Sequence, residues 1–142
     1  MASLSLVTAD RIHVVESIEQ HTAPASVAIT AGTLVSIDAT TGKFVKADAD
    51  GAGTLAIVYG VATKTTAAGA ALTAVRKGVI SGWDLSAVSY WVNVLAADTA
   101  GEVTVTSSES NGGSADVVIG RVIGVFDHLI GGTPTKAVLL TL

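Results

Sequence analysis

The sequence holds few residues whose types and spacing could support chemistry, and the first candidate is an acidic loop. "DADGAG" (Asp48 to Gly53) resembles the start of a calcium loop, in which carboxylate oxygens bind the ion. An EF-hand loop requires Gly at its sixth position and Glu at its twelfth. Here Gly53 fills the sixth position, but Tyr59 stands at the twelfth and Ala52 at a ligand position. We therefore interpret this segment as a solvated hairpin loop, and we predict no metal site.

A glycine-rich stretch beside this loop matches a dinucleotide-binding fingerprint. "GAGTLA" (Gly51 to Ala56) has the G-x-G-x-x-A spacing. That motif binds a pyrophosphate only where a helix N-terminus follows, because the helix supplies the N–H donors. The residues that follow, "IVYGVAT", have a strand pattern. We interpret the match as accidental and predict no cofactor.

The candidate nucleophiles and bases are also poorly placed. "GVISG" puts Ser81 one position away from the centre that a nucleophile elbow requires. His13, His21 and His128 are far apart, and none has the i, i+4 partner of a helical metal pair. We predict that the protein is not an enzyme. A cleft that unites a His with Ser81 or with an acid would favour the opposite.

The composition indicates one domain whose surface is covered by something else. The chain has 142 residues, which is the size of an ordinary domain, and no cysteine. Hydrophobic residues make up 49% and charged residues 14%, against about a quarter charged in an ordinary soluble domain. So little charge is typical of a surface that sister subunits or a larger assembly cover. An apolar monomer is the alternative.

Charge and hydropathy predict neither a nucleic-acid partner nor a membrane partner. The net charge is −4 and the basic residues are scattered, whereas nucleic acid requires a clustered positive surface. The start of the chain, "MASLSLVTAD", has no basic segment and too short an apolar run for a signal peptide. The most apolar run, Val117 to Phe126, contains Arg121 and is too short to span a bilayer.

Alternating apolar runs separated by turn residues indicate strands along most of the chain. Turn residues recur about every 8–12 residues, which is typical of a compact all-β domain. Pro24 and Pro134 lie outside the runs, as sheet hydrogen bonding requires. We predict a small β-sandwich or barrel of short strands. Its hairpins are Gly32–Gly51 and Leu85–Val105. Its other strands are Thr54–Lys64, two short runs within Ala70–Leu85 punctuated by Gly78 and Gly82, Ala115–Leu129 and Thr135–Leu142.

The first 25 residues differ from the rest, since they precede the first clear turn. We divide the chain into an extended N-terminal arm, residues 1–25, which is only partly packed, and a β-rich domain, residues 26–142. An ordinary first strand is the alternative to an arm.

Two segments could be helical instead. Residues 10–21 have Asp10 as an N-cap and an apolar face formed by Ile12, Val15 and Ile18. Residues 65–75 are rich in alanine, but Gly69 interrupts them.

Trp83, Tyr90 and Trp91 are the notable aromatic residues in a chain that is 4% aromatic. Packing under a sheet is one interpretation. An interface anchor is the second, because aromatic side chains concentrate binding energy at contacts. A platform for a sugar is the third.

The order of several short motifs resembles the capsid cement (decoration) proteins of tailed phages. The resemblance covers about residues 31 to 142, and the arm matches poorly. Where that family often has a plain "VYLS"-type strand, this chain has Trp91 to Val94. The matching motifs are Ala31-Gly32, Gly60-Val61-Ala62, Ala68-Gly69, Gly78-Val79, Asp84-Leu85-Ser86-Ala87, Asp98-Thr99-Ala100-Gly101 and Ile119-Gly120-Arg121-Val122.

The resemblance implies a structural role rather than catalysis. Such proteins bind the outer face of an expanded icosahedral head, often as trimers at local threefold positions, and clamp neighbouring major capsid subunits. We therefore expect a homo-trimer whose partner is the major capsid protein. We expect it to be made in the host cytoplasm and located on the outer surface of the virion.

The arm is our candidate for the capsid contact, by pairing with a capsid strand or loop through β-augmentation. The aromatic residues Trp83, Tyr90 and Trp91 are the candidate oligomer or capsid interface. The alternatives are another phage virion component, such as a tail or head-fibre base, and a carbohydrate-binding β-module with Trp83 and Trp91 as its platform. The arm residues that we expect to make the contact are Leu4, Leu6, Val7, Ile12, Val14 and Val15.

Overall fold

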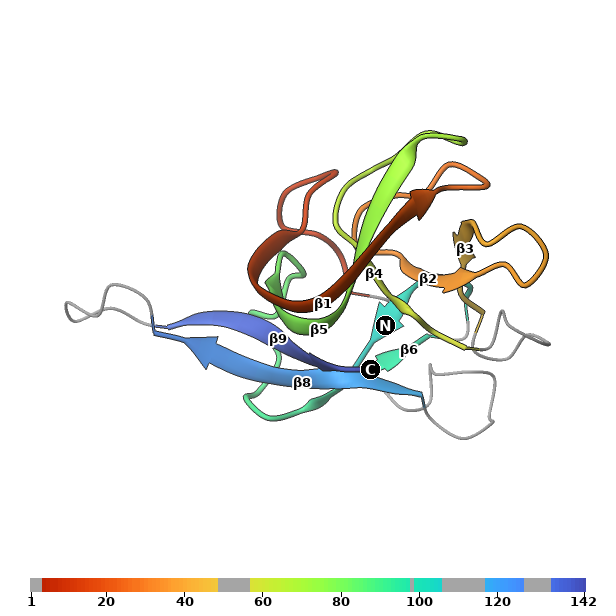
Figure 1. Ribbon diagram of the computed structural model, residues 1–142. Helices are drawn as coiled ribbons and strands as arrows, with labels where there is room; N and C mark the ends of the chain where they lie inside the picture. Colours follow the sequence, from red (N-terminus) through yellow and green to blue (C-terminus); the bar gives the residue numbers. More distant parts are fainter. Residues whose placement is uncertain (1–3, 49–56, 98, 106–116, 127–133) are drawn as a thin grey trace.

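The computed structural model describes residues 4–48, 57–97, 99–105, 117–126 and 134–142. Within these ranges the chain forms one antiparallel sheet of nine strands, curled into a half-barrel (Figure 1). This confirms the prediction of a small all-β fold. The strands are β1 (His13–Pro24), β2 (Leu34–Ile37), β3 (Phe44–Lys46), β4 (Gly60–Ala62), β5 (Ala71–Ser81), β6 (Asn93–Ala96), β7 (Val103–Thr104), β8 (Val118–Val125) and β9 (Thr135–Thr141).

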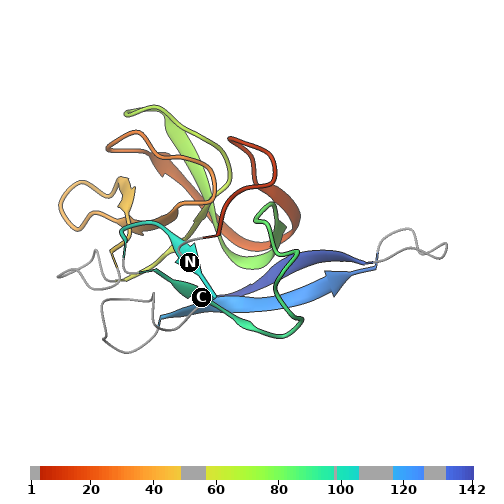
Figure 2. The same ribbon diagram turned by 180° about the vertical axis from the view of Figure 1, so that it is seen from behind.

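The strand order places β5 at the centre of the fold. The order is β3-β2-β4-β5-β9-β8-β6-β7, and β1 pairs with β5 outside this path. Along one edge, β5 pairs with β1 over its full length. Along the other edge, Ala74 and Val75 pair with β4, and Lys77 to Ile80 pair with β9. Figure 2 shows from behind how the sheet bends between β4 and β9.

The prediction that residues 70–85 hold two short runs was wrong, because β5 continues through Gly78. This glycine has φ +146°, and a side chain there would overlap the carbonyl of Glu16 on β1. Only glycine permits both that backbone conformation and so close an approach. The residue therefore lets β5 continue at a point where β1 crosses close to it.

The core lies on the inner side of the curled sheet and consists largely of small aliphatic side chains. The larger cluster includes Val75, Ile80, Val94 and Val138, all with no exposed surface, and buried Trp83. A smaller cluster surrounds Phe44, under the hairpin of β2 and β3. Fully burying an aliphatic side chain stabilises a fold by roughly 1.5–3 kcal/mol. The core therefore needs neither a disulfide nor a metal.

The two predicted hairpins are present. β2 pairs with β3, and β6 pairs with β7. The turn of the second hairpin contains Gly101 in the left-handed conformation, with φ +78°. The preceding Asp98 lies outside the described residues.

The turn between β2 and β3 is held by the carboxylate of Asp38. The N–H groups of Thr40 and Thr41 donate to its Oδ1 at 2.7 and 3.0 Å, and the N–H of Gly42 donates to its carbonyl. These backbone donors hold the pKa of Asp38 below its usual range, because they favour the charged form. The ionised carboxylate therefore stabilises the hairpin.

Replacing Asp38 with alanine should cause a modest loss of stability at neutral pH. A lowered pKa in the folded state means that the stabilisation is present above the ordinary pKa and disappears as the pH falls through the lowered value. The difference in unfolding midpoint between the protein and Asp38→Ala should therefore shrink in acid, as thermal unfolding against pH would reveal. Asp38→Asn keeps an acceptor oxygen and is the control. An equal deficit for Asp38→Ala at every pH would contradict this account.

Neither of the two segments that could be helical forms a helix in the residues described. Residues 13–24 form β1, and Asp10 lies in a turn with φ +64° instead of capping a helix. Residues 65–70 precede β5, which begins at Ala71. The apolar spacing of three that suggested the first helix has another origin. Val15 and Ile18 are each the extra residue of a β-bulge in β1.

Several sequence predictions fall on residues outside the described ranges. These are the "GAGTLA" match, most of the acidic loop and His128. In the region described, no helix is long and apolar enough to cross a membrane.

Candidate binding surface

The start of the segment expected to reach a capsid is packed on the sheet instead. Residues 4–7 lie across Trp83, and we call them the strap. The N–H of Leu4 donates to the carbonyl of Val103, and the N–H of Val7 donates to that of Gly82. Leu6 forms a β-bridge with Trp83. Residues 4–25 are thus packed along the sheet, and β1 has the arrangement of an ordinary first strand. Whether this segment contacts another protein stays a prediction.

The six arm residues divide into two groups by exposure. Leu4, Leu6 and Val14 are half-buried against the larger core cluster, and Ile12 is only 5% exposed. Val7 and Val15 are exposed. The structure therefore leaves two of the six side chains open to solvent, and these are the ones that can contact a partner without opening the fold.

β1 is a long edge strand, and this is the feature that sequence reasoning missed. Within the described residues its 12 residues pair with β5 alone, so its other edge is open. Val15 and Ile18, 41% and 67% exposed, stand at the two bulges. A bulge turns a side chain away from the regular alternation. An open edge with apolar side chains is a template on which a strand of another protein can pair.

An ion pair lies next to this edge. Arg76 donates to the carboxylate of Glu19 at 2.7 Å, where a third irregularity of pairing falls between β1 and β5. The hydrogen bond lowers the pKa of Glu19 and raises that of Arg76. Burial raises the pKa of the neighbouring Tyr59, whose ring packs near His21. The ion pair of Glu19 and Arg76 ties β1 to β5, and these groups form no catalytic pair of acid and base.

The three candidate aromatic residues lie in different environments. Trp83 is 4% exposed and belongs to the core, where Leu6 covers it. Tyr90 and Trp91 are 47% and 58% exposed. Phe126, directly after β8, is 62% exposed, and its ring and that of Tyr90 both approach Gly124. The structure thus brings together Tyr90 and Phe126 and leaves Trp83 inside.

Trp91 has an unusual backbone conformation and a cationic neighbour. Its φ is +66°, which is rare for a bulky residue. The guanidinium of Arg121 lies 4.9 Å from the centre of its ring and donates to its carbonyl at 3.4 Å. Lys136 lies 5.2 Å from the ring of Tyr90 and donates to the carbonyl of Val88. The result is an exposed aromatic surface with two positive charges, and strained residues of this kind cluster at functional sites.

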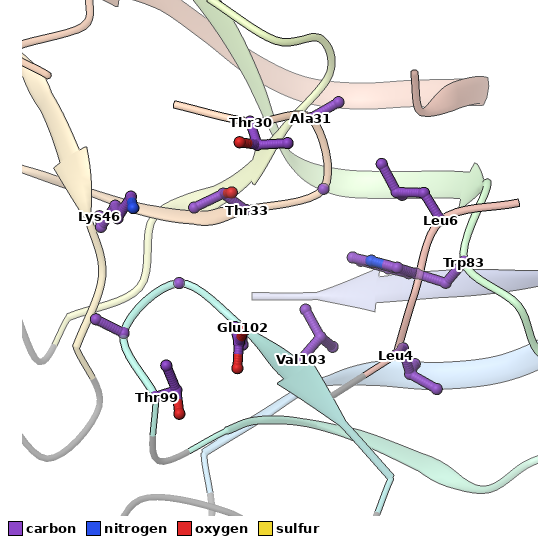
Figure 3. Close-up of a pocket in the computed structure, with 13 residues that line it drawn as sticks. Leu4, Leu6, Thr30, Ala31, Thr33, Lys46, Trp83, Thr99, Glu102 and Val103 are labelled. Atoms are coloured by element: carbon purple, nitrogen blue, oxygen red, sulfur yellow. The ribbon is translucent and has the colours of Figure 1, made fainter. Parts of the chain in front are cut away.

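A hollow of about 380 Å³ lies between the strap and two turns, and Figure 3 shows the residues that line it. Thr30, Thr33 and Thr99 supply hydroxyls to its wall, and Lys46 and Glu102 supply opposite charges. Among the residues that line it there is no histidine and no serine. The wall offers hydrogen bonds, but it has no nucleophile paired with a base.

One shallow hollow does unite a histidine with Ser81. His13 lies directly opposite Ser81 across β1 and β5, and both line a hollow of about 270 Å³. Nucleophilic catalysis requires the base to hydrogen-bond the nucleophile and to be oriented by a third group. These two side chains form no hydrogen bond, and the described lining adds Arg11 and Lys136 rather than a carboxylate. The described residues also hold no cluster of three or more metal-ligating side chains.

Comparison with family models, curated proteins and solved structures finds no match for this chain. The resemblance to the capsid cement proteins therefore stays a prediction.

Proposed function

We propose that the chain is a structural virion protein that binds the outer surface of an expanded phage capsid and clamps neighbouring major capsid subunits. The observation that favours this role is the open edge of β1, with the apolar side chains of Val15 and Ile18 exposed beside it. A capsid strand that pairs with this edge gains main-chain hydrogen bonds along β1. The exposed side chains then supply specificity.

This proposal places the capsid contact on the packed first strand instead of on a free arm. The network of contacts that holds residues 4–25 on the sheet makes a rigid edge, and a rigid edge loses little entropy on binding. Many copies on one shell add avidity, so each contact can be weak. The resemblance further predicts a homo-trimer, and Tyr90 and Trp91 stay the candidate interface residues.

Lysine at the open edge should abolish head binding without unfolding the protein. Val15→Lys with Ile18→Lys places charges where a partner strand would pair, which is how natural edge strands prevent pairing. We expect loss of co-sedimentation with expanded heads, by at least about tenfold, since each buried apolar contact is worth more than 1 kcal/mol. The matched control is Val27→Lys, at a valine that is 46% exposed and lies outside β1.

The same assay separates the alternatives. Normal binding by the double-lysine variant would refute the role of the β1 edge, and binding to tails instead of heads would favour another virion component. A sugar module is favoured only by glycan binding that disappears on Trp91→Ala. The buried position of Trp83 leaves a two-tryptophan platform without one of its rings.

A further inference from the structure

We propose that two copies of this chain associate about a twofold axis through the outer face of β1, β5, β9 and β8. These strands lie side by side, as Figure 1 shows. The contact uses the face of the sheet and leaves the open edge of β1 available. It is therefore a different contact from the pairing of a capsid strand with the β1 edge proposed above.

A row of residues crosses this face, each directly opposite the next. Glu16 on β1 pairs with Val79 on β5, and Val79 pairs with Leu139 on β9. Leu139 pairs in turn with Arg121 on β8. Paired residues of antiparallel strands point to the same side of the sheet, so these four side chains share one face.

The row points away from the core. The residues on either side of Val79, Gly78 and Ile80, are buried, whereas Val79 itself is half-exposed. The same alternation holds at Leu139, between Val138 and Leu140. Because successive side chains of a strand point to opposite faces, the row lies on the outer side of the sheet. No other described strand covers this side.

The two ends of the row carry opposite charges, and a second copy of the chain can supply an ion-pair partner to each end. Its centre, Val79 and Leu139, is apolar, and its ends carry opposite charges. Glu16 is exposed and has no ion-pair partner among the described residues. Arg121 contacts the ring and carbonyl of Trp91, but no described carboxylate forms an ion pair with it. Each end therefore lacks the charge that the other end carries.

A twofold axis resolves this asymmetry. An axis parallel to the strands, lying between two facing sheets and passing between β5 and β9, exchanges β1 with β8 and β5 with β9. It sets Glu16 of one copy opposite Arg121 of the other, and Val79 opposite Leu139. Every contact then occurs twice, as an isologous interface requires. Strands are spaced about 4.8 Å apart in any sheet, so the match follows from the strand order together with the register of these four residues.

Trp91 adds an anchor to this contact. Its ring lies against Arg121 and is 58% exposed. In the facing arrangement, the end of the row that holds Arg121 comes over β1 of the second copy. The ring would therefore be covered there, and large aromatic side chains beside a charged pair are the usual sites of strong binding energy.

Charge reversal tests the contact on the purified full chain. Arg121→Glu alone and Glu16→Arg alone should each raise the dissociation constant by about a hundredfold, because the axis repeats each like-charge contact twice. An equimolar mixture of these two variants should associate again, since both contacts then join an arginine to a glutamate. Lys43→Glu, in the turn between β2 and β3, has the same charge change and should leave association intact.

Sedimentation equilibrium measures the outcome. The contact predicts an even number of copies: a dimer, or a pair of trimers if the predicted threefold contact also forms. A monomer, a lone trimer, or a mixture that fails to recover association would overturn the twofold contact. If Arg121→Glu does not fold, exposed Glu16→Arg must still weaken association, and no change there would overturn the contact equally. Head binding is scored separately, so a capsid-binding chain that stays monomeric refutes only this inference.

Discussion

Gly78→Ala should lower the free energy of unfolding by roughly 3–5 kcal/mol, because it combines a strained backbone with a steric overlap. Gly78 has φ +146°, a conformation that side chains rarely adopt. The added Cβ would overlap the carbonyl oxygen of Glu16 and lie 3.1 Å from the Cα of Ser17. Both are backbone atoms, so no rotamer change can relieve the overlap. β1 must move away from β5 or β5 must bend.

Gly69→Ala is the matched control for this substitution. Gly69 also has a positive φ, +83°, but a side chain there would meet nothing within 4 Å. It should cost only the left-handed backbone penalty, about 1–2 kcal/mol. Chemical denaturation of both variants gives the comparison. If both variants lost the same free energy of unfolding, β1 would lie farther from β5 at Gly78 than the structure shows.

The all-β class and the two hairpins could be predicted because their signals are local. Alternation between turn residues defines a strand wherever it packs, and β2–β3 and β6–β7 are joined by short turns with glycine or aspartate. The pairing of β1 with β5 could not be predicted in this way. It joins residues that are far apart in the sequence, from 47 positions between Pro24 and Ala71 to 68 positions between His13 and Ser81.

The helical interpretation of residues 10–21 has a physical cause in the bulges of β1. Val15 and Ile18 are three residues apart because each fills a bulge, and a bulge adds one residue to the two-residue period of a strand. A three-residue spacing is also the spacing of a helix face, so the pattern alone could not separate the two structures.

The surface could be predicted in part from single residues. Tyr90 and Trp91 were candidates from their type, and both are exposed. Arg121 interrupts an apolar run and belongs to one of the matching motifs, and a lone charge in such a strand marks its outward position. The position of Trp83 in the core depends on the strap of residues 4–7, which its own neighbours in sequence do not reveal.

Removing residues 1–12 should destabilise the fold by about 4 kcal/mol or more, since deleting one buried Ile or Leu side chain alone costs roughly 2–5 kcal/mol. Ile12 is 5% exposed and packs in the larger core cluster, and Leu4 and Leu6 pack against the same cluster. Their loss uncovers Trp83 and leaves the carbonyls of Gly82 and Val103 without the N–H groups that they accept from the strap. A shortened chain that fails to bind heads would therefore be uninformative about a capsid-binding arm.

Tryptophan emission separates uncovering of the core from loss of a mobile arm. In a Trp91→Phe background the signal comes from Trp83 alone, because the chain has two tryptophans. The full chain should emit at short wavelength, as expected of a residue that is 4% exposed. The shortened chain should shift to longer wavelength and unfold at lower denaturant. Removal of residues 1–3 is the control, because the strap that covers Trp83 remains. An unshifted spectrum after removal of residues 1–12 would show that the strap does not seal the core, and the N-terminal segment would again be a candidate for a free capsid-binding arm.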